Sequence, residues 1–343
     1  MKLSPLAHRR LAKFRANKRG SWSLVIVAIL FAVTLFANLI ANDRPLLIEF
    51  DGNTYSPLLR DYPETQWGGD FPTTTNYRDP YVQELLHKHG WAIWPPLRYR
   101  YDTINYNLTV PAPAPPSAEN PLGTDDQGRD VLARLIYGFR ISMLFGLALT
   151  TLASLIGVSV GALQGYFGGW VDLVMQRVIE IWSGLPALFL LIIMASLVQP
   201  NFWSLLGLLL LFSWMHLIAV VRAESLRARN LDYVKAARAM GLSDGAIIRR
   251  HILPNALVAA LTYLPFQLTG AITTLTALDF LGFGLPPGSP SLGELLAQGK
   301  NNIDSPWLGL TAFFTLGIVL TLLVFIGEAV RDAFDPRKNV SAA

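Results

Sequence analysis

The chain has 343 residues, of which 52% are hydrophobic and 15% are charged, and its formal net charge is +4. Soluble domains carry about 25% charged residues, so this deficit, together with a mean hydropathy of +0.38, indicates a membrane protein. The absence of cysteine excludes a disulfide framework and a thiolate metal site. The small net charge gives no reason to expect a nucleic acid partner, and no histidine spacing predicts a metal site.

The first 22 residues are basic, with seven Lys and Arg residues and no acid. An apolar run follows at residues 24–41, about the length of one bilayer crossing. A cleaved signal peptide is the competing interpretation, but its apolar region would be shorter and would end at a small-residue cleavage site. We therefore predict a basic cytoplasmic segment at residues 1–22 and a retained first span at residues 23–41.

A long polar segment comes next. Residues 42–135 hold eight basic and thirteen acidic residues and no apolar run of spanning length. The segment is rich in Tyr and Trp, which predicts an ordered unit rather than a disordered tether. Together with the helix start that follows, it forms a predicted periplasmic insert at residues 42–138. Two roles stay open: a docking surface for a periplasmic partner, or an aromatic rim at the lipid headgroups.

Several carboxylates gather at residues 123–130, which raises the question of a catalytic or metal site. The pattern Thr124-x-x-Gln127 matches a capping box, and Asp125 and Asp126 suit the first turn of a helix. Apolar residues at positions 131, 132, 135 and 136 then continue one helical face. We predict that an interfacial helix starts here, and we expect no catalytic residue.

Four further uncharged runs provide the remaining spans. Residues 141–171 make the second span, and residues 181–221 are long enough for two, with a turn at residues 199–201 and a kink at Pro186. The fifth span covers residues 252–278, and the last ends near residue 327. The prediction is an all-α polytopic membrane protein with six spans, whose five-span core covers residues 139–330. The distribution of Lys and Arg places the N-terminus, residues 222–255 and the tail at residues 331–343 in the cytoplasm.

Small and polar residues inside the spans indicate packing or a path. A small-residue stripe in the second span lets two helices approach closely, either within the chain or against a partner; it consists of Ala153, Gly157, Gly161 and Gly165. Polar groups in the fifth span face a neighbouring helix or a water-filled translocation path. We favour the path for Thr262, Gln267, Thr269, Thr273 and Thr276. His216 lies inside the fourth span, where we expect a neutral, hydrogen-bonded side chain.

The polar, basic segment at residues 231–254 predicts two short helices between spans. Four residues recur at helical spacing on one narrow face that another protein could approach closely: Tyr233, Ala236, Ala237 and Met240. Gly241 suits a left-handed C-cap, Ser243 suits an N-cap, and Pro254 closes the unit. A solvated loop that merely obeys the positive-inside rule is the competing interpretation.

This segment resembles the cytoplasmic EAA loop of bacterial ABC-importer membrane subunits. Its core reads Lys235-Ala236-Ala237, then Gly241, then Ile252-Leu253-Pro254, with lysine in place of the glutamate of the consensus. In that family the loop forms coupling helices that dock into a groove of the ATP-hydrolysing subunit. The resemblance implies an ATPase-coupling role for Tyr233, Ala236, Ala237, Met240, Gly241, Leu253 and Pro254.

The whole chain is similar in its order of elements to the C-type membrane subunits of dipeptide and oligopeptide ABC importers. A basic N-terminus, one span, an insert, the motif Gly-Thr-Asp-x-x-Gly-Arg-Asp at residues 123–130 and five spans follow one another. The long insert and residues 39–47 and 279–285 look most like the subunits that import microcin C and other peptides. The resemblance implies a type I ABC importer fold in the bacterial inner membrane. It also implies three partners for the peptide substrate: a second, homologous permease subunit in a heterodimer, a periplasmic peptide-binding protein, and an ATP-binding subunit that holds ATP and Mg.

The chain contains no Gly-x-x-x-x-Gly-Lys-Ser/Thr loop and no recognisable nucleophile and base. We therefore expect no enzyme activity and no cofactor in this chain. The simplest function is a transport subunit in which residues 231–254 convert closure of a partner ATPase into alternating access. The alternative is a channel or secondary transporter that ATP does not drive, although the inverted repeats common in secondary transporters are not recognisable here.

Overall fold

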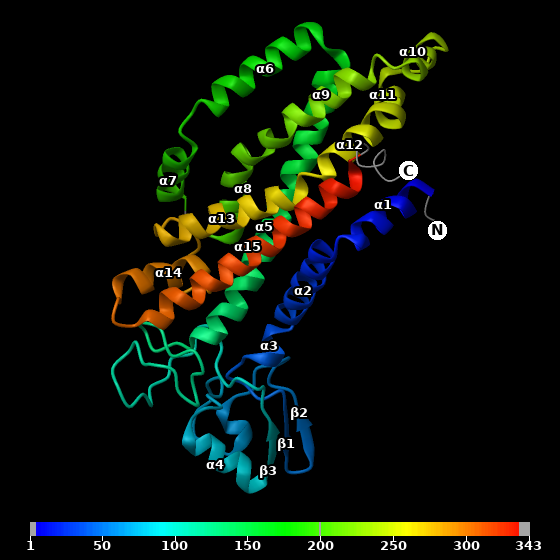
Figure 1. Ribbon diagram of the computed structural model, residues 1–343. Coiled ribbons are helices and arrows are strands. Elements are labelled where there is room, and N and C mark those ends of the chain that lie inside the picture. The colour runs from blue at the N-terminus through cyan, green and yellow to red at the C-terminus, as the bar shows by residue number, and fades with distance from the viewer. Residues whose placement is uncertain (1–4, 199, 336–343) are drawn as a thin grey trace. The chain divides into compact units, whose positions relative to one another are not determined.

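The computed structural model describes residues 5–198 and 200–335, and Figure 1 shows its elements in chain order. The described chain divides into two compact units. The first, called here the helical unit, comprises residues 1–29, 142–286 and 316–343, and the second, the insert unit, comprises residues 30–141 and 287–315. Three long helices, α2, α5 and α15, contribute residues to both units.

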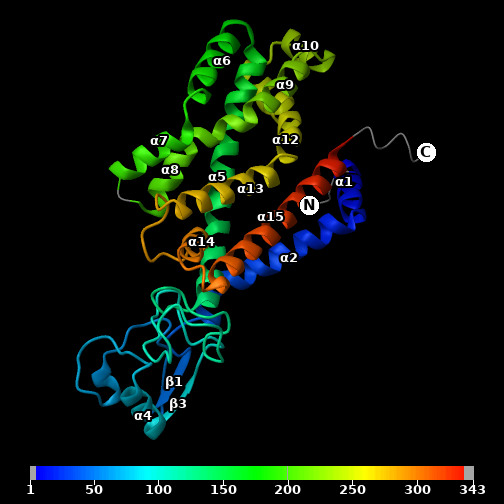
Figure 2. The same cartoon turned by 60° about the vertical axis from the view of Figure 1, so that its left-hand side comes forward.

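The described part of the helical unit is built from helices alone. Its N- and C-terminal helices are α1 (Pro5–Ala16), α2 (Lys18–Leu35) and α15 (Pro306–Phe334). Between them come α5 (Val131–Phe167), α6 (Gly169–Ser183), α7 (Ala187–Leu197), α8 (Phe202–Ser213), the 3₁₀ turn η2 (Trp214–Leu217) and α9 (Ile218–Ala228). The polar loop and fifth span form α10 (Asp232–Ala239), α11 (Asp244–Ile247), the π turn η3 (Ile248–Ile252), α12 (Leu253–Leu261) and α13 (Leu264–Phe280). In Figures 1 and 2, α9 and α12 lie side by side.

Among the described residues, four helices are long and apolar enough to cross a membrane: Lys18–Leu35, Val131–Phe167, Phe202–Ala228 and Pro306–Phe334. Two bent pairs bring the number of candidate spans to six if each pair crosses as one span. Gly169–Ser183 and Ala187–Met194 meet at 70°, and Asp244–Leu261 and Leu264–Phe280 meet at 56°. The first bend lies at Pro186, as predicted, and the second comes just before Pro265, because a proline interrupts the backbone hydrogen bonds of a helix.

The predicted turn at residues 199–201 falls partly outside the described residues, which omit Gln199. Asn201 caps α8: its side-chain oxygen accepts hydrogen bonds from the backbone N–H groups of Trp203 and Ser204, both at 2.9 Å. The Ser204 hydroxyl oxygen in turn accepts from the backbone N–H of Asn201, which completes a capping box. The restart of the helix after residue 200 is thus encoded locally.

The insert unit contains a small sheet, so the all-α prediction is wrong in this unit. Strands β1 (Leu47–Phe50), β2 (Asn53–Tyr55) and β3 (Gly90–Ile93) form an antiparallel sheet in the order β2-β1-β3. Asp51 and Gly52 join β1 to β2 in a two-residue turn with φ angles of 48° and 78°, the left-handed geometry that hairpin turns require. The helical elements of this unit are α3 (Ala37–Ile40), the 3₁₀ turn η1 (Glu64–Trp67), α4 (Pro80–His89) and α14 (Leu292–Asn301).

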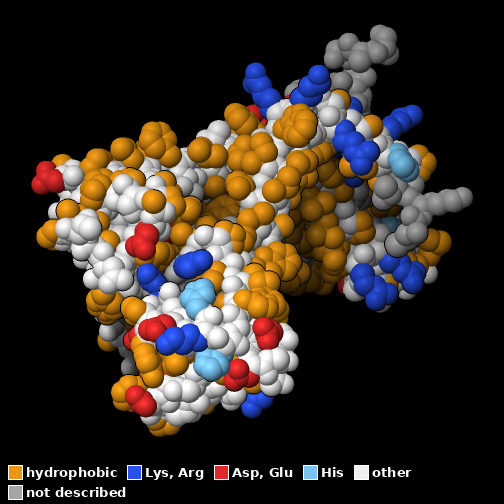
Figure 3. All heavy atoms as spheres, turned by 90° about the horizontal axis from the view of Figure 1, so that it is seen from below, with side chains coloured by type: hydrophobic (Ala, Val, Ile, Leu, Met, Phe, Trp, Pro, Cys, Tyr) orange, Lys and Arg blue, Asp and Glu red, His pale blue; other side chains and the backbone are white. Residues whose placement is uncertain are grey.

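Aromatic side chains form the core of the insert, which explains how a short three-stranded sheet remains ordered. Trp67 is 1% exposed, and its ring meets those of Phe50, Tyr55, Tyr62 and Tyr77 edge-on at centroid distances of 5.1–6.0 Å. Burial raises the pKa of Tyr77 to about 12. These clustered rings pack on one another, whereas Phe71, Tyr81, Trp91 and Tyr106 of the insert are exposed. Figure 3 shows side chains of both charges intermingled with hydrophobic ones on the molecular surface.

The predicted capping box at Thr124 is wrong, and no separate interfacial helix exists. Residues 123–130 form a loop in which Gly123 and Gly128 have φ angles of 77° and 80°, a conformation that ends helical geometry. The Thr124 hydroxyl oxygen accepts a hydrogen bond from the backbone N–H of Ala114 at 2.8 Å. Asp130 caps α5 by accepting from the backbone N–H of Ala133 at 2.7 Å. Helix α5 then continues for 37 residues, so the predicted boundary at residue 138 falls inside a helix.

Candidate coupling surface and its supports

The segment predicted to couple the chain to a partner folds as α10, a tight turn and α11. The turn is a Schellman motif: the backbone N–H of Leu242 donates to the carbonyl of Ala237 at 3.2 Å, and that of Gly241 donates to the carbonyl of Arg238 at 3.0 Å. Gly241 has a φ angle of 82°, which confirms the predicted left-handed C-cap. The motif fixes the end of α10 by backbone bonds alone and leaves its outer side chains free for contact.

The predicted single face of α10 is divided in the structure. Val234 and Ala237 are 1% and 2% exposed and pack in one apolar cluster with Tyr166, Ala228, Ile247 and Ile252. Tyr233 and Met240 are 45% and 73% exposed, and Ala236 is exposed beside them. Ala237 and Val234 therefore form a buried stripe that packs α10 against its own chain. Ala237 does not share the exposed face of Tyr233, Ala236 and Met240. The exposed residues Tyr233, Ala236, Met240 and Gly241 form what is called here the coupling surface.

Pro254 does not close this unit, contrary to the prediction. The π turn η3 carries the helical path from α11 into α12, and Pro254 is exposed in the first turn of α12. Ser243 occupies the N-cap position of α11 in backbone geometry, but its side chain makes no capping bond. Leu253 packs against the apolar cluster formed by Val158, Ala162, Leu217, Val221, Ala256 and Ala260.

Polar contacts hold Tyr233 and the short helices in place. The Tyr233 hydroxyl oxygen accepts a hydrogen bond from the Asn255 side chain at 3.0 Å, and its ring lies 5.7 Å from that of His251. The Tyr166 hydroxyl donates to Asp244, and the Arg238 guanidinium lies 5.2 Å from the centre of the Tyr166 ring. The hydrogen bond from Arg238 to Tyr166 raises the pKa of Arg238 above its usual value. These contacts therefore fix the positions of Tyr233 and Arg238 on α10.

The small-residue stripe of α5 packs against η2 and α9 of the same chain, which resolves the alternative left open by the sequence. A Cβ atom added at Gly157 would lie 2.5 Å from the carbonyl oxygen of Trp214, and one at Gly161 would lie 2.9 Å from Cβ of Val221. A Cβ atom at Gly165 would lie 2.5 Å from Cβ of Ser225. These approaches are closer than ordinary carbon contacts of about 3.5–4.0 Å, so glycine is required at all three positions. The fourth member of the stripe, Ala153, is 1% exposed.

A pocket of about 320 Å³ opens in the helical unit between α5, η2 and α13. Of the five predicted path residues Gln267 lines it, as does Thr274, another polar residue of the same span; the side-chain oxygen of Gln267 accepts a hydrogen bond from Ser154 at 3.0 Å. Each of the other four donates its hydroxyl to a carbonyl three or four residues earlier in its own helix; these are Thr262, Thr269, Thr273 and Thr276. A helical threonine satisfies itself in this way, so its polarity alone does not indicate contact with water. His216 also lines the pocket, and its Nδ1 lies 3.0 Å from the carbonyl oxygen of Ser213.

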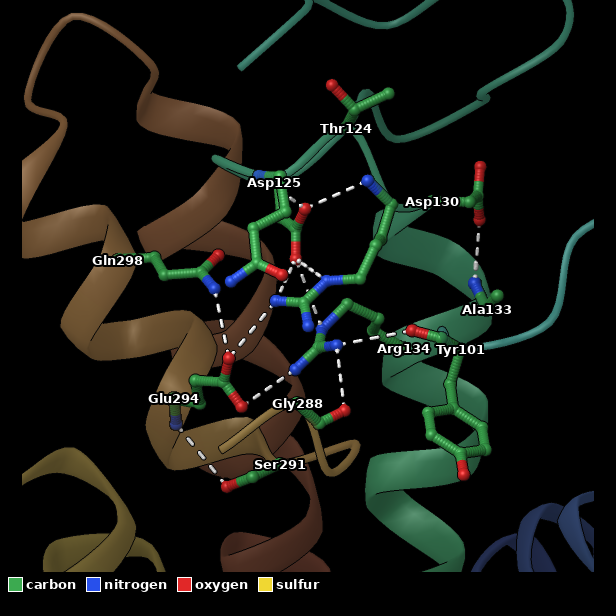
Figure 4. A network of polar contacts seen from close by, with 12 residues as sticks. Tyr101, Thr124, Asp125, Asp130, Ala133, Arg134, Gly288, Ser291, Glu294 and Gln298 are labelled. Atoms are coloured by element: carbon green, nitrogen blue, oxygen red, sulfur yellow. Dashed lines mark hydrogen bonds and ion pairs between the residues drawn. The ribbon is translucent and has the colours of Figure 1, made fainter. Parts of the chain in front are cut away.

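The insert unit contains a buried ionic cluster that the sequence patterns do not indicate (Figure 4). Arg129 and Arg134 are 3% and 0% exposed, and they contact Asp125 and Glu294, which are 0% and 24% exposed. Arg129 pairs with Asp125 at 2.6 Å and with Glu294 at 3.1 Å, while Arg134 pairs with Glu294 at 2.9 Å. Two positive and two negative charges balance, which a buried set of charges requires. The cluster joins the start of α5 to α14.

Backbone carbonyls complete the coordination of Arg134, which also donates to those of Ser289 and Tyr101 at 2.9 and 3.2 Å. Burial raises the pKa values of Asp126 and Asp130 beside the cluster, with the Asp125 charge adding to both shifts. The i,i+4 spacing of Asp125 and Arg129 was a local signal for one pair. Nothing local indicated Glu294, which lies 160 residues after Arg134. Within residues 5–198 and 200–335 no group of His, Asp and Glu side chains is arranged to hold a metal ion.

Comparison with known proteins identifies the family. Residues 153–340 match the family described as "Binding-protein-dependent transport system inner membrane component". The chain is 59% identical to the inner membrane ABC transporter permease protein YejE of Escherichia coli (strain K12), over 99% of each chain. It is 55% identical to the peptidoglycan transport system permease protein YejE of Agrobacterium fabrum, over 98% of this chain and 94% of the relative.

A more distant sequence relative agrees with this assignment. The oligopeptide transport system permease protein OppC of Lactococcus lactis subsp. cremoris is 34% identical over 68% of this chain and 81% of its own. A solved structure of the MetNI methionine ABC transporter in inward-facing conformations has a TM-score of 0.48 at 19% identity, over 58% of this chain and 96% of that one. The predicted resemblance to peptide-type permeases is confirmed by the sequence relatives. The chain therefore belongs to the family of binding-protein-dependent transport system inner membrane components, as a multi-pass inner membrane permease of the YejE type.

Proposed function

We propose that the chain is a permease subunit of an ATP-driven importer of peptides, and that a partner ATPase docks on the coupling surface. The exposed Tyr233, Ala236 and Met240 carry this proposal, because they present an apolar surface on a helix whose C-terminal end is fixed by the Schellman motif. Relatives named as ABC transporter and oligopeptide transport permeases support the energy source and the substrate class. On this proposal ATP and Mg are bound by the partner and not by this chain.

The packing of the helical unit indicates how a push on α10 would travel. Val234 and Ala237 bind α10 to α9, α11 and α5 through one apolar cluster. The π turn joins α11 to α12 without a gap in the helical path, and α12 packs along α9. The glycine stripe in turn seats α9 directly on the backbone of α5. Closely packed elements move as a body, so ATPase closure at α10 would tilt these helices together and alternate access to the central pocket.

The remaining partners follow from the same proposal. A second, homologous permease subunit forms a heterodimer with this chain, and a periplasmic peptide-binding protein delivers the substrate to the side that carries residues 42–138. The N- and C-termini and the coupling surface then face the cytoplasm. Peptide antibiotics such as microcin C fall within the proposed substrate class.

The test compares two variants that place a carboxylate at neighbouring positions of α10. Ala236→Glu puts the charge on the coupling surface, whereas Lys235→Glu, whose side chain is 64% exposed, puts it about 100° away around the helix. An unpaired charge buried in an interface costs about 1–3 kcal/mol, so Ala236→Glu should reduce docking by roughly tenfold or more. The assay is ATP-dependent peptide uptake and peptide-stimulated ATP hydrolysis by the complete transporter in proteoliposomes.

We expect Ala236→Glu to lose both activities at an unchanged membrane level and Lys235→Glu to keep them within about twofold. Uptake that persists in both variants would refute docking on this surface. Uptake by the chain without any ATPase would instead support a channel or secondary transporter.

A further inference from the structure

A second, polar pocket of about 440 Å³ lies within the insert unit and belongs to neither the coupling surface nor the ionic cluster. It is formed where the end of α3, the first part of α5 and two loops of the insert come together. Three arginines from three separate segments line it beside amide and phenol groups: Arg44, Arg100, Arg140, Asn42, Tyr101 and Tyr137. Such a concentration of guanidinium groups is typical of a site for an anion.

Among the described residues, one arginine of the pocket makes no ion pair. Arg44 is paired with Asp61, and Arg100 lies 3.2 Å from a carboxylate oxygen of Asp102. The Arg140 guanidinium lies 4.6 Å from the centre of the Tyr137 ring and makes no ion pair within the residues that the structure describes. Asp43 and Asp102 both act electrostatically on Arg100, so the half-buried Arg140 is the guanidinium that lacks a carboxylate of its own.

The walls of the pocket are held in place by bonds that do not use Arg140. The Tyr137 hydroxyl lies 2.7 Å from the side-chain oxygen of Asn38 and 2.9 Å from the carbonyl oxygen of Ala41, which fixes the ring beneath Arg140. The side-chain oxygen of Asn42 accepts from the backbone N–H of Arg44 at 3.3 Å, and Arg100 donates to the Tyr101 hydroxyl oxygen at 3.2 Å. The site is therefore preorganised, which lowers the entropic cost of binding.

Apolar side chains lead along the helices to this pocket. On α5, residues 144 and 147 lie four and seven positions after Arg140 and so share its helical face; Leu144 and Leu147 are 41% and 38% exposed. On the α2–α3 side, Phe36 and Leu39 are 60% and 42% exposed. An arginine at the end of an exposed apolar face of a spanning helix matches the level of the lipid headgroups.

We propose that this pocket binds the phosphate of a phospholipid headgroup. A phosphodiester carries one negative charge, which balances the single charge of Arg140, and its oxygens accept the paired hydrogen bonds of a guanidinium. The acyl chains lie along the exposed apolar residues next to the pocket. A bound lipid thus joins the end of the first span to α5 where both enter the insert.

The binding test uses the full-length chain, stripped of lipid in detergent, and three probes: phosphatidylglycerol, diacylglycerol with the same acyl chains, and inorganic phosphate. We expect phosphatidylglycerol alone to raise the melting temperature and to remain bound in native mass spectra. Equal stabilisation by diacylglycerol would show that the phosphate is not recognised and would overturn the proposal. Equal stabilisation by inorganic phosphate would show a site for the free anion and would also overturn it.

The matched variants are Arg140→Gln and Arg98→Gln. Arg98 also lies over an aromatic ring, that of Trp94 at 5.0 Å, but it does not line this pocket. Loss of a charge-assisted hydrogen bond should weaken phosphatidylglycerol binding by roughly tenfold in Arg140→Gln and leave Arg98→Gln unchanged. Arg140→Lys keeps the charge and serves as the second variant if Arg140→Gln does not fold; its affinity should fall between those of the other two. Wild-type affinity in Arg140→Gln would refute the proposal. If Arg140→Gln does not fold, wild-type affinity in Arg140→Lys, equal to that of the control Arg98→Gln, would refute it.

Discussion

Replacing glycine by alanine, which adds one methyl group, should lower the stability of this protein at one helical position and raise it at another. Gly165→Ala places a Cβ atom 2.5 Å from Cβ of Ser225 and 2.6 Å from the carbonyl oxygen of Arg222. Neither neighbour is the far end of a flexible side chain, so α5 and α9 must separate. Gly207→Ala, in α8, meets no atom within 4 Å. The two variants make the same chemical change in helices of the same chain.

The expected magnitudes differ in sign. Alanine is favoured over glycine in a helix by about 1 kcal/mol, and this gain alone acts at Gly207. At Gly165 it is outweighed by overpacking, which costs about 1–3 kcal/mol. The net change is therefore a loss of roughly 1 kcal/mol at Gly165 and a gain of about 0.5–1 kcal/mol at Gly207.

Thermal unfolding of the detergent-solubilised chain, followed by loss of monodisperse protein, measures this difference. A change of 1 kcal/mol corresponds to a shift of about 2 °C in the melting temperature for a chain of this size. We expect a lower melting temperature for Gly165→Ala and a higher one for Gly207→Ala. Equal or reversed shifts would refute the close packing of α5 against α9.

Two further outcomes concern the insert unit. Glu294→Gln should lower the free energy of unfolding by about 3 kcal/mol, because Arg134 loses the carboxylate that lies 2.9 Å away. Thermal unfolding should show a much smaller effect for the exposed control Glu84→Gln. Equal effects in the two variants would contradict a stabilising ionic cluster. Asp130→Asn should remove the contribution of this carboxyl group to the pH dependence of folding stability. Burial raises the pKa of Asp130 above its ordinary value of 3.8, so the folded chain keeps a proton that the unfolded chain releases. The resulting stability is present below 3.8 and is lost as the pH rises through the raised value. The melting temperature difference between wild type and Asp130→Asn should change across that window, and a constant difference from about pH 3.5 to 7 would contradict this assignment.

Signals that lie within a few residues of one another predicted the helical unit well. Uncharged runs located the four described helices that are long and apolar enough to cross a membrane, Pro186 located a bend, and Gly241 located the end of α10. Asp51-Gly52 between alternating residues was an equally local hairpin signal, and with it the sheet of the insert could have been anticipated. The capping box failed because Gly128, one residue beyond it, takes a left-handed conformation that the letters alone do not specify.

Features that depend on distant partners could not be predicted. Helical spacing placed Ala237 beside Tyr233, but the packing of Val234 against residues far along the chain decided that Ala237 is buried. Arg134 and Glu294 find each other across 160 residues, and neither has a neighbour in sequence that indicates the pair. Local patterns in the sequence indicated which segments carry the candidate site. The orientation of their side chains depends on contacts between distant residues that exist only in the folded chain.

The π turn at Ile248–Ile252 has a consequence for register. One additional residue in a turn rotates everything that follows it by about 100° around the helix axis. Ile247, before the turn, packs in the apolar cluster of α10, whereas Ala256 and Ala260, after it, pack against Val158 and Val221. This rotation lets the buried faces of α11 and α12 point in different directions although the helical path is continuous. A change in the length of the turn would therefore rotate one helix relative to the other.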